Sequence, residues 1–335
     1  GERTPDIQTT LNIADVLGVP MGFFFQGDIE FVESTGVSFR SRNSELRKAT
    51  REKAIASLTL ACRDLEKEVR SRFNLPAPDL PHVTGVAPWM AAARVRSEWK
   101  LGVYPIPSMI RLLEAKGIRV YWFDETDKSV DALCKIEKAI PYIVLSQRER
   151  GGERMRFDLA HELGHLVMHR GMKDMSRKQI ESEADQFASA FLMPEEQFRK
   201  EFPANSSMRH LLNQKSRWGV SLAAMIHRCY DLKLYSEYQY KSAFQKIGNN
   251  GWRLEEPGRL PVETSRVWES VFDYLSSLGV TIDDFAAKLN LHKEDIFSLV
   301  PYSKVVNKAE SEESLRRKNL TLEELGYSAP EDAFS

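Results

Sequence analysis

Apolar residues recur at intervals of three and four along most of the chain, which is the period of helices with one buried face. Two short, mostly apolar runs interrupt this pattern, Ile118–Phe123 and Ile140–Ser146, and they predict strands. Pro141 indicates that the second strand lies at a sheet edge. Helices with a few strands among them are typical of an α+β domain. The helices predicted around these strands are Trp89–Lys100, Ser108–Lys116 and Arg154–His169.

Two further groups of helices are predicted on the C-terminal side. A Gly/Pro-rich junction over Asn249–Pro261 separates the two groups, and a charged tail runs from Asn307 to Ser335. The predicted elements are the helices Glu195–Phe202, Ser207–Trp218, Ser221–Leu232 and Ser236–Ile247, followed by a helical unit over Ser265–Tyr302.

On the N-terminal side, Gly1–Gln26 contains one short amphipathic helix, and Ile29–Phe39 alternates loosely enough for a strand or hairpin. A long helix over Ser44–Phe73 then carries a narrow apolar seam, which predicts packing on the body of the protein or on a second subunit. The Pro-rich segment Asn74–Pro88 predicts a linker. The seam consists of Ile55, Leu58, Cys62, Leu65 and Val69.

The helix predicted over Arg154–His169 contains the sequence His161-Glu162-Leu163-Gly164-His165. Positions four apart share a helix face, so both imidazoles can reach one metal ion. Glu162 can reach a water on that ion without being a ligand. Two imidazoles with a carboxylate beside them are what zinc-dependent hydrolysis requires. The surrounding residues are apolar, so the helix is expected to be buried. Burying two histidines and a glutamate is costly unless they have partners, and metal binding would supply one.

A second amphipathic helix, around residues 181–192, offers the third ligand. Glu181 can complete a site of two histidines and one carboxylate with a fourth position open, and Glu183 is a rival that spacing does not exclude. Asp185 can accept the outer N–H of a liganding histidine and fix its tautomer. His169 lies about 12 Å beyond His161 along a helix axis, so we interpret it as a helix-end residue.

HELGHLVMH followed by ExxADxFASAFLMP resembles the ImmA/IrrE family of zinc-dependent metallopeptidases. The resemblance extends through PIPSMIRLLEAKGIRVYWFD and RWGVSLAAMIHRCYDLKLYSEYQYKSAFQKIGNNGWRLEEPG, and it covers approximately Thr9–Pro257. It implies a zincin-like α+β peptidase domain with a small mixed or antiparallel sheet. It also implies zinc on His161, His165 and Glu181, with Glu162 as the catalytic base. The better-known family members cleave helix-turn-helix repressors, which implies a protein substrate.

Gly1–Gln26 resembles the end of an XRE-type helix-turn-helix domain, as in longer family members that carry this domain in the same chain. The preceding helices, including the one that would enter the major groove, do not occur in this sequence. We therefore expect an N-terminally incomplete domain, with DNA binding only through its complete form.

Charge and composition argue against several functional classes of protein. Lys+Arg total 47 and Asp+Glu total 48, so the chain as a whole is not an electrostatic nucleic-acid binder. No run of about 18 apolar residues predicts a membrane span, and no signal peptide is recognised. The three cysteines lack C-x-x-C spacing and are expected to be reduced, in a cytoplasmic protein that makes no membrane contact.

The sequence thus predicts a helix-turn-helix remnant (1–26), a long helix with a linker (27–88), a metallopeptidase domain (89–250) and a helical C-terminal region with a charged tail (251–335). Tyr121 and Tyr142, on the two predicted strands, are candidates for supporting the oxyanion, although aromatic residues in strands usually belong to the core.

The expected function is that of a zinc endopeptidase. Its substrate would be a helix-turn-helix repressor, and the same chain would also regulate transcription. A homodimer through the helix seam is a further expectation. The alternative is a DNA-binding regulator or antitoxin-like protein that does not cleave, and that uses the peptidase fold to sense a ligand or partner.

Overall fold

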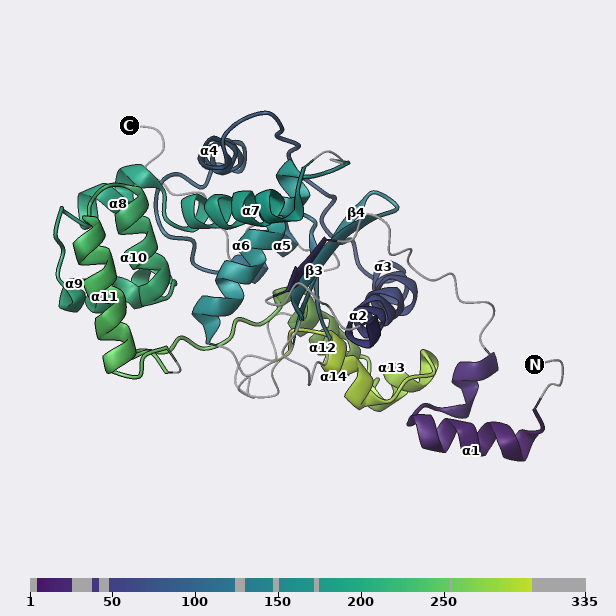
Figure 1. Ribbon diagram of the computed structural model, residues 1–335. Coiled ribbons are helices and arrows are strands. Elements are labelled where there is room, and N and C mark those ends of the chain that lie inside the picture. Colours follow the sequence, from purple (N-terminus) through teal and green to yellow (C-terminus); the bar gives the residue numbers. More distant parts are fainter. Residues whose placement is uncertain are drawn as a thin grey trace.

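The computed structural model describes residues 5–25, 38–41, 48–123, 130–146, 151–171, 175–253 and 255–302. The fold is α+β, as predicted: a small mixed sheet with helices packed on both of its faces (Figure 1). The charged tail predicted over residues 307–335 lies outside the described ranges. Within those ranges, no helix combines the length and the apolar character needed to cross a membrane.

The sheet has four strands in the order β1-β3-β4-β2. β2 pairs in parallel with β4, whereas β3 pairs antiparallel with both β4 and β1. The prediction of an edge position for Ile140–Ser146 is wrong, because this strand is β4 and lies inside the sheet. Pro141 is tolerated there because the pairing with β2 begins only at Tyr142. The strands are β1 (Ser38–Ser41), β2 (Arg119–Phe123), β3 (Val130–Glu137) and β4 (Ile140–Ser146).

The two faces of the sheet belong to two different cores, because successive residues of a strand point to opposite sides. One face contributes to the core beneath α6 (Gly152–Met168) and α7 (Arg177–Leu192). The other face packs against the N-terminal helices and the last three helices. On the α6 side lie Val120, Ala132, Cys134, Ile143 and Leu145; on the other side lie Tyr121, Leu133, Tyr142 and Val144.

The helices on the α6 side of the sheet and the helices that follow α7 begin close to where the sequence predicts them. A serine side chain accepts a hydrogen bond from the first turn of five of these helices, which explains where each one starts. The capping residues are Ser108, Ser176, Ser207, Ser221 and Ser236. Besides α6 and α7, this group contains α4 (Pro88–Glu98), α5 (Met109–Ala115), α8 (Glu195–Glu201), α9 (Met208–Trp218), α10 (Leu222–Asp231) and α11 (Glu237–Asn249).

The long N-terminal helix is present as α2 (Lys48–Leu60), a π-helical turn (Ala61–Leu65) and α3 (Glu66–Arg70). Leu58, Leu65 and Val69 of the predicted seam are buried inside the chain's own second core, so this part of the seam packs on the body of the protein. The other elements on the N- and C-terminal sides are α1 (Ile7–Leu17), a 3₁₀ turn (Met21–Phe25), α12 (Arg266–Ser277), α13 (Ile282–Lys288) and α14 (Lys293–Leu299).

The predicted linker, Asn74–Pro88, and the Gly/Pro-rich junction, Asn249–Pro261, both contact α6. Val83 is buried, and its amide donates to the carbonyl of Val167 on α6 at 3.0 Å. In the Gly/Pro-rich junction, the Leu260 carbonyl accepts from the amide of Gly152 at 2.9 Å, at the start of α6. Both segments therefore help to position the helix that carries the HELGH sequence.

Candidate metal centre

Three side chains from α6 and α7 converge at one point. His161 and His165 lie one turn apart on α6, and their Nε2 atoms are 3.0 Å from each other. Glu181 comes from the first turns of α7, with carboxylate oxygens 3.4 Å from His161 Nε2 and 3.7 Å from His165 Nε2. Among the described residues, these three form the group whose ligand atoms lie close enough to share a metal ion.

The spacing of the three donors fits a tetrahedral metal. Zinc–nitrogen and zinc–oxygen bonds of about 2.0–2.2 Å place tetrahedral ligands about 3.3–3.6 Å apart. The observed separations of 3.0, 3.4 and 3.7 Å scatter around this range. Two imidazole nitrogens and one carboxylate also leave a fourth position for water or substrate, as catalytic zinc sites do.

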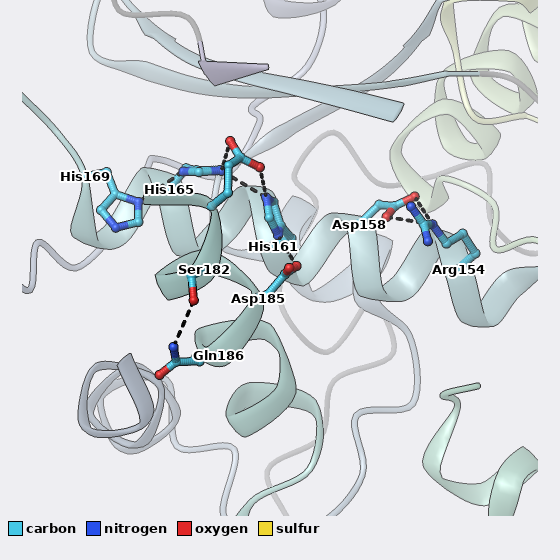
Figure 2. Close-up of polar contacts among 9 residues, drawn as sticks. Arg154, Asp158, His161, His165, His169, Ser182, Asp185 and Gln186 are labelled. Atoms are coloured by element: carbon cyan, nitrogen blue, oxygen red, sulfur yellow. Dashed lines mark hydrogen bonds and ion pairs between the residues drawn. The ribbon is translucent and has the colours of Figure 1, made fainter. Parts of the chain in front are cut away.

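Each histidine of the group is held by a contact to its outer ring nitrogen, as Figure 2 shows. Asp185 Oδ1 lies 2.8 Å from His161 Nδ1, where it can accept the N–H. His169 Nδ1 lies 3.0 Å from His165 Nδ1. These contacts turn both Nε2 atoms toward Glu181 and set the tautomer that leaves a lone pair on Nε2.

His169 lies at the end of α6, as expected, and its ring also contacts two other polar side chains. Its amide donates to the carbonyl of His165 at the end of α6, as expected of a helix-end residue. Its ring also contacts His165, and its Nε2 lies 3.3 Å from a carboxylate oxygen of Glu183. Glu183 therefore contacts His169, whereas Glu181 is the carboxylate that lies beside the Nε2 atoms of His161 and His165. Burial lowers the pKa of His169, against the opposing effect of Glu183.

Glu162 is fully buried on α6, between the two histidines in sequence. The Cys134 thiol of β3 lies near its carboxylate, and burial together with this neighbouring charge raises the pKa of the thiol well above its ordinary value. Cys134 is thus a buried, protonated thiol that can donate to Glu162. The sequence indicated the buried thiol but gave no sign of the contact, because β3 was not recognised as a strand.

Buried cations fix the first half of α6. The guanidinium of Arg156 donates to three backbone carbonyls, at 2.5, 2.9 and 3.2 Å, and forms an ion pair with Glu263. Lys215, from α9, pairs with Glu153 near the start of the helix. Pairing and hydrogen bonding compensate the cost of burying these charges, and the geometry they require holds the helix in one orientation.

Tyr121 and Tyr142, the candidates for supporting the oxyanion, do not lie at the candidate metal centre. Both side chains belong to the core on the opposite face of the sheet, with ring centroids 6.2 Å apart. The Tyr121 hydroxyl is 3.5 Å from a carboxylate oxygen of Glu66 on α3. The alternation of side chains along β2 and β4 turns both tyrosines away from α6, so this placement contradicts the predicted role at the oxyanion.

Residues 113–230 match the family model described as Peptidase M78, IrrE N-terminal-like domain. The matched segment contains the sheet strands β2 to β4 and the helices α6 and α7, and therefore the whole candidate metal centre. The match supports the resemblance to the ImmA/IrrE family and a peptidase-type function for this segment. No curated protein matches the chain.

Proposed function

We propose that this chain is a zinc-dependent endopeptidase. The observation that carries the proposal is the convergence of His161 Nε2, His165 Nε2 and the Glu181 carboxylate at tetrahedral spacing. Zinc suits a set of two nitrogen donors and one oxygen donor with an open position. Glu162, the residue next to the first ligand, completes the arrangement used for hydrolysis.

When bound, zinc acidifies water and polarises a carbonyl at neutral pH. The protein supplies the proton transfers. Glu162 accepts the proton of the attacking water and passes it to the leaving amide nitrogen. The buried thiol of Cys134, whose pKa is raised, lies beside this carboxylate and stays protonated. Asp185 and His169 hold the two imidazoles in place while the charge at the centre changes.

The substrate we propose is a helix-turn-helix repressor, and we propose that the same chain acts in transcriptional regulation. Two observations support this. Residues 1–26 resemble the end of an XRE-type domain, and α1 exposes much of its apolar surface, as segments that contact a partner often do. DNA binding would require the complete form of that domain. The exposed apolar residues of α1 are Ile7, Leu11, Ile13, Val16 and Leu17.

The test measures metal content and cleavage together. Purified protein is assayed for zinc by elemental analysis and then incubated with a candidate helix-turn-helix repressor, with chelator, and with chelator followed by added zinc. Zinc with chelator-sensitive cleavage, restored by zinc, supports the proposal. Zinc without cleavage favours the alternative of a regulator that senses a partner. A chain that binds no zinc contradicts the proposed peptidase.

A further inference from the structure

A groove outside the metal centre lies on the side of α7 that faces away from the histidines. It has a volume of about 730 Å³, and its walls come from α4, α7, α8 and α10. Gln186 of α7 lines it, and Figure 2 shows this side chain pointing away from His161 and His165. The volume lies within the roughly 300–1,000 Å³ of pockets that hold small molecules. The groove is therefore a candidate binding site that the proposed peptidase does not use.

One arginine in the wall of this groove has hydrogen-bond donors to spare. Arg228 is only 6% exposed, and its Nε donates to the carbonyl of Met193 at 2.9 Å. In the ranges that the structure describes, its two Nη groups have no acceptor. Burial lowers the pKa of Arg228, so the site imposes a cost on its charge. An anion bound by the two Nη groups would offset this cost with charge-assisted hydrogen bonds.

The charges around the groove also favour an anion. Of the three carboxylates among its described lining residues, two belong to α8 and pair with cations of the same helix, at 2.7 and 2.9 Å. The third, Asp231, stands against three cations that line the groove, Arg96, Arg228 and Lys233. None of these three forms an ion pair with a carboxylate in the described part of the chain. Positive charge therefore exceeds negative charge in the groove, which attracts anions.

Two exposed aromatic rings belong to the same lining. Trp89 of α4 is 57% exposed and Tyr230 of α10 is 36% exposed. The Tyr230 ring packs against Tyr240, with centroids 4.6 Å apart, so its orientation is held by packing. Exposed aromatic faces bind planar rings by stacking and by burying apolar area. An inorganic anion would leave both rings exposed, so the groove suits a ligand that has a ring as well as a charge.

We propose that this groove binds a small organic anion with a planar ring. Its carboxylate or phosphate lies on the Nη groups of Arg228, its ring lies against Trp89 or Tyr230, and Lys233 adds attraction from the rim. Binding there requires neither metal nor turnover, so the site does not depend on the proposed peptidase function. α7 lines the groove and also carries Glu181, so the ligand contacts the helix that provides a proposed metal ligand.

The test is titration calorimetry of the full chain with three probes that share one ring system: 1-naphthyl phosphate, 1-naphthoate and the neutral 1-naphthol. The titrations are run with a chelator, so that no metal can hold the anion, and are repeated without it. At least one of the two anions should bind, at least about tenfold more tightly than 1-naphthol. The tighter of the two identifies the ligand as a phosphate or a carboxylate. Failure of both anions to bind, or equal binding of 1-naphthol, would overturn the proposal.

Three variants locate the bound anion. Arg228→Gln should weaken its binding by at least about tenfold, because it removes a charged donor pair. Trp89→Ala should weaken it by about tenfold through the loss of stacking. Lys233→Asn should weaken it by about two- to fivefold, as expected for an exposed charge. Lys100→Asn is the matched control for Lys233→Asn and should bind like the wild type. Both lysines have positive φ, 55° and 60°, which asparagine tolerates, and Lys100 does not line the groove.

Trp89 and Lys233 are exposed, so their variants keep the test decisive if Arg228→Gln does not fold. Anion affinities that are the same in the wild type, Trp89→Ala and Lys233→Asn would show that the anion binds elsewhere, and the proposal would fail. Binding that occurs only without chelator and is unchanged in Trp89→Ala would place the anion at the metal centre, with the same consequence. Binding that persists in chelator and is lost in the groove variants would support the groove, whether or not the chain cleaves a substrate.

Discussion

Gly164 of α6 packs directly against the ring of Phe187 of α7: a Cβ at position 164 would lie 3.1 Å from a ring carbon. A larger side chain at this position would require the Phe187 ring to shift by a few tenths of an ångström, so glycine suits this close approach. It sets the distance between the two helices, and hence the distance between the histidines of α6 and Glu181 of α7. The glycine inside HELGH therefore contributes to the metal centre without touching it.

Replacing Gly164 by valine should push α7 away from α6. We expect a loss of about 1–3 kcal/mol in the free energy of unfolding, as for other overpacked cores, together with weaker zinc binding. Urea unfolding and zinc competition with a chromogenic chelator measure the two effects. Gly248→Val is the control, because Gly248 is also helical and a Cβ there meets only ordinary contacts, at 3.7 Å or more. Equal losses in the two variants would show that the helix spacing does not depend on Gly164.

The two acidic residues at the start of α7 should differ in their effect on the metal. Glu181→Gln removes a proposed ligand and should lower zinc affinity by more than the roughly 10- to 100-fold typical of an outer partner. Glu183→Gln changes the contacts to His169 and Gln179, neither of which is a proposed ligand, and should stay within that range. Both affinities are measured by chelator competition. A larger loss for Glu183→Gln would mean that the ligand assignment is wrong.

Asp185→Asn should weaken zinc binding by about 10- to 100-fold, because the amide no longer fixes the His161 ring with a negative charge. Gln186→Ala is a suitable control, since the Gln186 side chain contacts the exposed Ser182 at 3.2 Å and points away from the histidines (Figure 2). The same chelator competition applies. If both variants bind zinc like the wild type, Asp185 has no role in orienting His161.

Glu114 gives the protein a pH-dependent stability. This fully buried carboxyl accepts hydrogen bonds from the Ser265 hydroxyl and from the amides of Arg266 and Val267, at the start of α12. Burial raises its pKa from 4.5 to about 7, with the charge of Glu269 adding to the rise. The folded state therefore keeps a proton that the unfolded state has lost, so the stabilisation is complete below pH 4.5 and disappears as the pH rises through 7.

Glu114→Gln, which cannot ionise, should remove this dependence. Relative to the variant, the wild type should lose up to about 3 kcal/mol of unfolding free energy between about pH 4.5 and pH 8. Urea unfolding of both proteins across this range measures the difference. A difference that stays constant with pH would contradict a raised pKa at Glu114.

The elements that local sequence determines were predictable. Apolar spacing located the helices from α4 to α11, and the spacing inside HELGH placed His161 and His165 on one face. Spacing on the next helix offered Glu181 and Asp185 but left Glu183 open, and only the family resemblance implied Glu181. The structure brings Glu181 and Asp185 to the histidines.

What depends on contacts between distant segments was not predictable. β3 carries charged residues that weaken its apolar pattern, although Lys135 is buried and pairs with Glu137 at 2.9 Å. Without β3, the sequence could show neither the interior position of β4 nor the contact between Cys134 and Glu162. The face on which Tyr121 and Tyr142 lie depends on which distant helices cover each side of β2 and β4, and local sequence does not show this.

The central claim is that Glu162 is the base of a zinc hydrolase, and Glu162→Gln tests it most directly. Zinc content and cleavage of a helix-turn-helix repressor are measured on the same preparations of wild type and variant. The account predicts that the variant retains zinc as the wild type does, while cleavage falls by about 10²- to 10⁴-fold or more. Cleavage by Glu162→Gln at the wild-type rate would contradict it.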